Sequence, residues 1–348
     1  MLWTSANPPY QAKGFPGSWR MKEPLLCVDN LTTRFTTSSG TVLAVDRVSF
    51  SISRGEVLGI VGESGSGKSQ IFMSIAGLLP PNGQVSGEAR FLGRNLIGAD
   101  ESELNRIRGR ALAFVFQDPM TALHPFRTIA SQLTEMLRLH RGLDHGAARA
   151  EALRLLDRVH IPDAKRRLDM YPHELSGGMR QRVMIAMSIS CNPRLLIADE
   201  PTTALDVTVQ LQVLDLLDEL RRDEGIAIAL ITHDMGVVSR LSDRVIVIYA
   251  GNIVEEGATE EVLLSPTHPY TQGLLASMPD LYRPLSALSP IPGYPPDGRQ
   301  ARKGCMFAPR CSRAQNVCRD VFPELTARTG HQRQACHFPI SGSQGLAS

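Results

Sequence analysis

Short, uninterrupted apolar runs recur along this chain, and they are typical of strands that are buried on both faces of a parallel sheet. They occupy residues 57–61, 111–116, 195–198, 226–232 and 245–249. Between about residues 118 and 190 the pattern changes: apolar residues follow helical spacing, as in 147–156. Residues 86–92 read as a hairpin strand. The pattern therefore predicts an α/β fold with a parallel sheet, a β-hairpin and a helical subdomain.

The first apolar run leads directly into a glycine-rich loop and then a helix-like stretch, 70–76. This is the strand, loop and helix context that the phosphate-binding motif G-x-x-x-x-G-K-S requires. Glycines let the backbone N–H groups turn toward phosphate oxygens, and the lysine reaches the β- and γ-phosphates. We predict that ATP binds at Gly62, Glu63, Ser64, Gly65, Ser66, Gly67, Lys68 and Ser69.

Two acidic residues, Asp199 and Glu200, follow the buried run 195–198 at the end of a predicted parallel strand. Ligands of open parallel sheets bind at this end of the strands. The two carboxylates should have different tasks. We predict that Asp199 and the Ser69 hydroxyl hold Mg²⁺, and that Glu200 orients or deprotonates the water that attacks the γ-phosphate.

A third motif narrows the class of P-loop protein. The segment consists of Leu175, Ser176, Gly177, Gly178, Met179, Arg180 and Gln181. With it, the chain resembles the ATP-binding subunits of ABC transporters, from about residue 25 to the last cysteine. The resemblance makes this segment the signature motif, a second anion-binding helix N-terminus. In the family it contacts the γ-phosphate of ATP held by the partner subunit.

The same resemblance assigns four further residues. Gln117 matches the glutamine that senses Mg²⁺ and the attacking water, and Asp206 matches the aspartate of the loop that crosses the dimer interface. His233 matches the switch histidine that contacts the γ-phosphate. Phe35 is the candidate for the aromatic residue that stacks on adenine, with a partly buried strand aromatic as the alternative. Catalysis is thus assigned to Glu200, His233 and Gln117.

Beyond about residue 265 the sequence resembles the C-terminal extension of the dipeptide, oligopeptide and nickel importer ATPases, notably at 268–279 and 291–296. So does 117–125, in which His124 stands where asparagine is usual. The resemblance implies a P-loop NTPase (ABC ATPase) core with an antiparallel β subdomain and an α-helical subdomain, followed by a small Cys-rich C-terminal extension. We predict that the chain is the ATP-hydrolysing subunit of a bacterial importer that takes up di- and oligopeptides across the inner membrane. The same role in a nickel, glutathione or opine importer is the alternative. The sequence lacks the long coiled coils or zinc-hook insertions of a DNA-repair ATPase and the two tandem cassettes of a translation factor. It also keeps Glu200, His233 and the signature residues, at least one of which a non-hydrolysing partner would have lost.

The extension contains four cysteines, spaced C-x5-C-x6-C-x17-C. Disulfides are rare where thiols stay reduced, and four thiolates suit soft metals. Structural zinc sites favour close C-x2–4-C pairs, which this spacing lacks. We expect a [4Fe–4S] cluster, with Zn²⁺ or unligated thiols as alternatives, at Cys305, Cys311, Cys318 and Cys336. The surrounding arginines are then either a solvated basic surface or compensation for an anionic cluster.

Composition bounds the remaining possibilities. The chain has 348 residues, 43% of them apolar and 21% charged, with a formal net charge of +2. This near-neutral charge predicts no nucleic-acid partner. No apolar segment approaches the ~18 residues that cross a bilayer, so the permeation path should lie on other chains. The resemblance implies a second homologous ATPase, two transmembrane permeases and an extracytoplasmic binding protein, at the cytoplasmic face of a bacterial inner membrane.

Three regions follow. We expect a disordered extension at 1–20. The sequence from Met21 onward resembles the N-terminus of the family, so Met21 is a candidate for the natural initiator. A nucleotide-binding domain should span 21–265, with its helical subdomain at about 118–190. The C-terminal extension with the cysteines should span 266–348.

Overall fold

The protein is described by a computed structural model, which covers residues 24–203, 205–277, 290–299, 302–327 and 332–340. The expectation for residues 1–20 lies outside the described residues. Two sheets form the framework. A four-stranded sheet has the order β2-β1-β4-β5, and an eight-stranded sheet has the order β11-β12-β10-β9-β3-β8-β7-β6.

The four-stranded sheet is antiparallel throughout. Its strands are β1 (Pro24–Thr37), β2 (Gly40–Ser53), β4 (Gly83–Phe91) and β5 (Arg94–Asn95). Along β1 and β2 buried and exposed positions alternate in part, which fits a sheet with one face on the core. The predicted hairpin strand at 86–92 is the second half of β4.

The centre of the larger sheet is parallel and the edge toward the C-terminus is antiparallel. Its strands are β3 (Val57–Val61), β6 (Leu112–Val115), β7 (Leu195–Asp199), β8 (Ala227–Ile231), β9 (Arg244–Tyr249), β10 (Asn252–Ala258), β11 (Thr326–Ala327) and β12 (Arg333–Gln334). Every residue of β3 and β8 is buried, as their continuous apolar sequences predict. Because the central strands run in parallel, their carboxyl ends meet at one edge.

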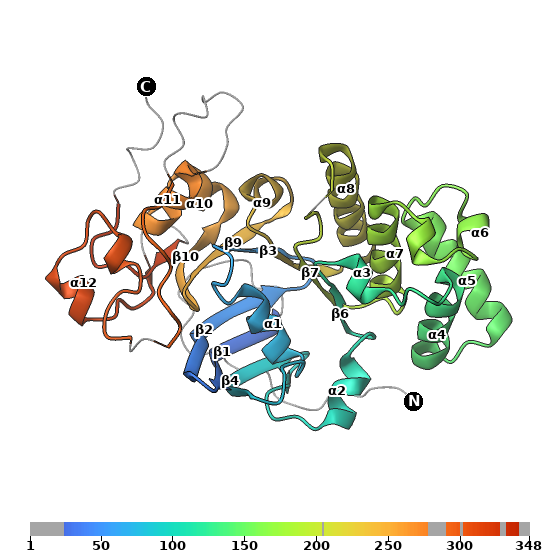
Figure 1. Ribbon diagram of the computed structural model, residues 1–348, viewed down its shortest axis with the longest axis horizontal. Helices are drawn as coiled ribbons and strands as arrows, with labels where there is room; N and C mark the ends of the chain where they lie inside the picture. The colour runs from blue at the N-terminus through green and yellow to red at the C-terminus, as the bar shows by residue number, and fades with distance from the viewer. Residues whose placement is uncertain (1–23, 204, 278–289, 300–301, 328–331, 341–348) are drawn as a thin grey trace.

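Helices surround the sheets and form a separate group on one side (Figure 1). That group contains α3 (Pro119–Ala122), α4 (Ile129–Arg141), α5 (His145–Arg158), α6 (Ala164–Arg167), η1 (Pro172–Glu174) and α7 (Gly177–Ile189). The others are α1 (Lys68–Ile75), α2 (Glu101–Ile107), α8 (Val207–Glu224), α9 (Met235–Leu241), α10 (Thr259–Leu264), α11 (Pro269–Ala276), η3 (Ala308–Arg310) and α12 (Asn316–Asp320).

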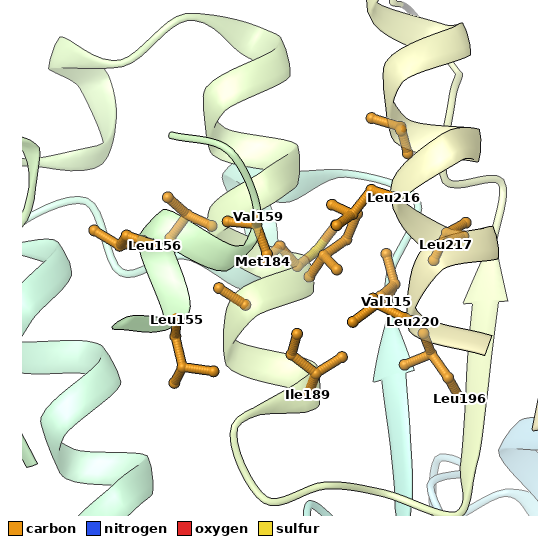
Figure 2. Close-up of a cluster of buried hydrophobic side chains, with 14 of the residues drawn as sticks. Val115, Leu155, Leu156, Val159, Met184, Ile189, Leu196, Leu216, Leu217 and Leu220 are labelled. Atoms are coloured by element: carbon orange, nitrogen blue, oxygen red, sulfur yellow. The ribbon is translucent and has the colours of Figure 1, made fainter. Parts of the chain in front are cut away.

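One buried apolar cluster joins the helical group to the sheet. Leu155, Leu156 and Val159 of the α5 region pack with Met184 and Ile189 of α7 (Figure 2). The same cluster continues into the sheet and α8 through Val115, Leu196, Leu216, Leu217 and Leu220. Helix α7, which begins in the predicted signature motif, is therefore held between the helical group and the nucleotide-binding sheet.

The described residues after Leu264, here called the C-terminal segment, pack directly on the core. Strand β12 pairs with β10 and so extends the larger sheet, and β11 pairs with β12. Phe307 is buried in a cluster with Tyr249 of β9 and Tyr270 of α11, with ring centroids 5.3 and 5.5 Å away. Strand pairing and aromatic packing thus fix this segment to the rest of the molecule.

Candidate nucleotide site

The glycine-rich loop connects the end of β3 to the start of α1. Gly67 has a φ of 99°, in the region that side chains rarely adopt, and it closely approaches β2. A Cβ atom on Gly67 would lie 2.3 Å from the Ala44 carbonyl oxygen. Only glycine fits here. The backbone of the loop is consequently exposed at the edge of the sheet where ligands of parallel sheets bind.

Lys68 lies inside the curve of this loop. Its side chain is buried, and its ammonium group donates to the carbonyl oxygens of Gly62 and Glu63 at 2.8 and 2.9 Å. Burial lowers the pKa of Lys68, and the neighbouring carboxylates oppose that effect. The buried hydroxyl of Ser66 has no hydrogen-bond partner within the described part of the chain. A cradle with a cation and an unused donor fits phosphate oxygens.

Asp199, the last residue of β7, lies next to Ser69 of α1. Burial raises the pKa of Asp199, and the nearby Ser69 hydroxyl opposes this rise. A hydroxyl and a carboxylate are hard oxygen donors of the kind that Mg²⁺ takes while it keeps most of its waters. The two residues therefore fit the metal that accompanies ATP.

Glu200 is the centre of a hydrogen-bonded group. Its carboxylate accepts from Gln117 Nε2 at 3.2 Å and from Thr203 Oγ1 at 2.8 Å, and it lies 3.1 Å from His233 Nδ1. These partners follow three different parallel strands, β6, β7 and β8, whose carboxyl ends meet. The structure thus brings together the three residues to which catalysis was assigned, Glu200, His233 and Gln117.

The predicted signature motif spans the end of η1 and the start of α7. The Ser176 side chain caps α7 by accepting from the Met179 N–H at 3.3 Å. Gln181 is buried, and its Nε2 has no hydrogen-bond partner among the described residues. Within the described part of the chain, no hydrogen bond or ion pair links residues 175–181 to the loop 62–69. The motif therefore stands apart from the phosphate loop of its own chain.

The two remaining assignments lie at element ends. Asp206 caps α8 by accepting from the Val209 N–H at 3.0 Å. Phe35 lies on β1 opposite Val42 of β2 and Gly83 of β4, and its ring is beside Gly83. Its part in binding adenine stays a prediction.

Three residues that contact the site were not singled out from the sequence. Thr203 donates to Glu200. Its position shortly after the acidic pair was a usable signal. Tyr270 and Arg310 both contact Glu63 of the phosphate loop. They lie 207 and 247 residues away in the chain, so no local pattern could have indicated them.

The prediction of an iron–sulfur cluster is wrong. Within the described residues, no group of three or more His, Cys, Asp or Glu side chains is arranged to hold a metal ion. Cys305, Cys311, Cys318 and Cys336 do line one cavity, but its volume is about 20 Å³, room for about one water molecule. Burial also raises the pKa of three of these thiols, that of Cys336 to about 11, so in the metal-free protein they are protonated at neutral pH.

Three arginines of the same segment pair with acidic residues outside it. Arg310 pairs with Glu63, and Arg302 approaches Asp46 of β2 at 3.5 Å. Arg333 pairs with Glu256 of β10 at 2.6 Å. These three arginines therefore attach the C-terminal segment to acidic residues of the core. They neither form a solvated basic surface nor balance the charge of an anionic cluster.

Comparisons with known proteins divide the chain into two matched parts. Residues 45–203 match the family model of ABC transporters, and residues 254–318 match that of the oligopeptide/dipeptide transporter C-terminal region. The oligopeptide transport ATP-binding protein OppD of Haemophilus influenzae is 51% identical over 90% of this chain and 97% of its own length. The dipeptide transport ATP-binding protein DppD of Escherichia coli is 45% identical over 91% and 97%.

Solved structures agree with this similarity. A dimeric ATP-binding cassette in a post-hydrolysis state, bound to ADP and Pi, matches with a TM-score of 0.61 and 30% identity. The matched region covers 67% of this chain and 98% of the cassette's chain. A cassette from the cbiONQ transporter of Clostridium perfringens matches with a TM-score of 0.58 and 30% identity, over 69% of this chain and 90% of that one. Among the described residues, no helix combines the length and apolar character needed to span a bilayer.

Proposed function

The chain belongs to the ATP-binding subunits of peptide-importing ABC transporters, and from this premise we propose how its residues divide the work of ATP hydrolysis. It is the ATPase subunit of a peptide importer and works with membrane permease components. The observation that carries the division is the Glu200 carboxylate, held by Gln117, Thr203 and His233 beside Lys68 and Asp199.

The phosphate loop binds the triphosphate. Backbone N–H groups of 65–69 and the Lys68 ammonium neutralise the β- and γ-phosphates, and the free Ser66 hydroxyl adds a donor. Ser69, Asp199 and Gln117 would hold Mg²⁺, which when bound neutralises charge on the phosphate oxygens. Phe35 is proposed to stack on the adenine ring.

Glu200 acts on water. Its carboxylate accepts a proton from the water molecule whose oxygen forms the new bond to the γ-phosphorus, while the bond from the γ-phosphorus to the β-bridging oxygen breaks and ADP leaves. Gln117 and His233 lie on opposite oxygens of the carboxylate: Gln117 and Thr203 contact Oε2, and His233 contacts Oε1. These contacts fix the direction in which Glu200 faces, and His233 is free to contact the γ-phosphate when ATP is bound.

The signature motif completes the site of another subunit. Its separation from the phosphate loop of the same chain supports an arrangement in which two ATPase subunits sandwich ATP. In that arrangement Ser176, Gly177 and Gly178 donate to a γ-phosphate held in trans, and Asp206 lies at the interface. We propose that the second subunit is a homologous ATPase, that two permeases carry the path, and that an extracytoplasmic binding protein delivers cargo.

The cargo class follows from the C-terminal region. Its match to the oligopeptide/dipeptide transporter model, together with two kinds of peptide-transport relatives, favours di- and oligopeptides over nickel, glutathione or opines. We propose that the subunit works at the cytoplasmic face of a bacterial inner membrane, bound there by the permeases.

The replacement Glu200→Gln tests the assignment of the base. Glutamine keeps the shape of Glu200 and one acceptor oxygen but cannot take the proton, so turnover should fall roughly 100- to 10,000-fold. Binding of Mg-ATP, measured by calorimetry, should stay within about threefold. The control Lys68→Ala should instead weaken Mg-ATP binding, because it removes a phosphate contact. Wild-type turnover by Glu200→Gln would contradict this role.

A further inference from the structure

Glu63, the second residue of the phosphate loop, is bound through each of its three polar groups. Its carbonyl oxygen accepts from the Lys68 ammonium at 2.9 Å. Its backbone N–H donates to the Tyr270 hydroxyl at 2.9 Å. Its carboxylate accepts from both terminal nitrogens of Arg310, at 2.8 and 3.0 Å. Two of these three partners belong to the C-terminal segment and the third is the phosphate-binding lysine.

Arg310 is held rigidly at its end of the contact. Only 6% of its side chain is exposed, against 23% for Glu63. Its guanidinium also donates to the carbonyl oxygens of Pro292 and Ile291 and lies 5.8 Å from the centroid of the Tyr249 ring. Burial alone would lower the pKa of Arg310, but its hydrogen bonds to Glu63 and Tyr249 outweigh this and raise it. A planar, two-point ion pair of this kind fixes orientation as well as distance.

Tyr270 is equally fixed. It is fully buried, and its ring packs against Tyr249 and Phe307 with centroids 4.6 and 5.5 Å away. Burial raises the pKa of its hydroxyl, which stays protonated at any physiological pH. The oxygen of this hydroxyl accepts from the Glu63 N–H, while the Glu63 carbonyl accepts from the Lys68 ammonium.

We infer that Arg310 and Tyr270 are positioning residues for nucleotide binding: through Glu63 they hold the phosphate loop and Lys68 in the geometry that receives ATP. A loop with glycine at 62, 65 and 67 can adopt many backbone conformations, and ordering it when ATP binds costs conformational entropy. Contacts from outside the loop lower this cost because they order the loop before the nucleotide binds. This role requires only that ATP binds at 62–69, whichever residue activates the water.

The test compares Arg310→Gln, Glu63→Gln and the double variant in the full-length chain. Dissociation constants are measured by calorimetry with Mg-ADP and with Mg-AMP-PNP, an analogue that is not hydrolysed. Each single variant should bind both nucleotides roughly tenfold more weakly, in line with the loss of one charged hydrogen-bonded pair. The double variant should be no weaker than either single one, because Arg310 acts only through Glu63.

Tyr270→Phe provides an independent variant if Arg310→Gln does not fold. It removes the acceptor of the Glu63 N–H and keeps the ring in its cluster, so binding should weaken roughly fivefold with little change in melting temperature. Arg299→Gln is the matched control, since it breaks an exposed ion pair with Asp297 in the same segment and should leave binding unchanged. Lys68→Ala is the positive control.

Two results would overturn the inference. In the first, Arg310→Gln, Glu63→Gln and Tyr270→Phe lower the melting temperature but keep nucleotide dissociation constants within twofold of wild type, as expected of contacts that only fasten the segment. In the second, the losses in Arg310→Gln and Glu63→Gln multiply in the double variant, so the two residues act separately.

Discussion

Glu200 adopts a left-handed backbone conformation, with φ at 48°, directly after the last residue of β7. A residue other than glycine rarely does so, and the conformation costs about 1–3 kcal/mol. Its N–H donates to the Ile231 carbonyl at 2.8 Å, and three side chains hold its carboxylate. The turn directs the carboxylate across the ends of β6 and β8. The strained backbone thus lies at the residue that we propose as the catalytic base, and such strain is common at active sites.

His268 is a second residue whose surroundings have a measurable consequence. It caps α11 by accepting from the Tyr270 N–H at 3.0 Å, and burial lowers its pKa from 6.5 to about 3. Above pH 6.5 the folded and unfolded states both hold it neutral. Between pH 6.5 and 3 the unfolded chain binds a proton that the folded chain excludes. This residue therefore reduces the free energy of unfolding as pH falls through that window.

We predict that His268→Asn flattens the acid dependence of stability. Asparagine keeps a side-chain acceptor for the cap but does not titrate. Between pH 6.5 and 5.5 the wild-type free energy of unfolding should fall by up to about 1.4 kcal/mol more than that of the variant. Urea unfolding at the two pH values measures the difference. Equal slopes for both proteins would show that His268 does not exclude the proton.

At the scale of elements, the sequence predicted strands more reliably than contacts. The strands β3, β6 and β8 lie within the predicted apolar runs, and β7 and β9 each exceed their run by one residue, because a strand buried on both faces has a nearly continuous apolar sequence. Strand β12 is only Arg333–Gln334, and its pairing with β10 carries no such signal. The cysteine spacing was misleading, because four cysteines can line a cavity that is too small for a cluster.

The candidate site likewise contains residues that the sequence indicated and residues that only the fold reveals. Gln117, Glu200 and His233 were predictable because each belongs to a motif or follows an apolar strand. Arg310 and Tyr270 were not, because each reaches Glu63 only through the folded arrangement of the C-terminal segment. A side chain that acts across such a separation has no fixed sequence spacing to its target.

The packing of α7 on α8 depends on one glycine of the signature motif. A Cβ atom on Gly178 would lie 2.4 Å from Val209 Cγ1, and valine has little freedom at χ1. We predict that Gly178→Ala separates the two helices and destabilises the protein by about 1–3 kcal/mol. Val209→Ala removes the clashing atoms, so the double variant should recover most of this loss. Denaturant midpoints measure both; a double variant no more stable than Gly178→Ala would contradict the clash.

At the scale of the whole molecule, the chain holds apart the two elements that we propose to bind nucleotide, the phosphate loop and the signature motif. Figure 1 shows α7 with the helical group at one side and the C-terminal segment at the other, with α1 and the sheets between them. The C-terminal segment contacts the phosphate loop from the side opposite to the helical group. This arrangement supports the proposal that each chain supplies a phosphate loop to one ATP and a signature motif to another. It also places the C-terminal segment where it contacts Glu63 of the phosphate loop.

The most direct test of this account is the dependence of ATP turnover on association. Turnover per chain is measured over a range of concentrations in which light scattering reports the fraction of dimer. The full-length chain is measured alone and then with the proposed homologous ATPase added. The account predicts that turnover follows the fraction of dimer. If the chain pairs only with the homologous ATPase and not with itself, the chain alone should be nearly inactive. A constant, vigorous turnover per chain at concentrations where the protein is entirely monomeric would contradict it.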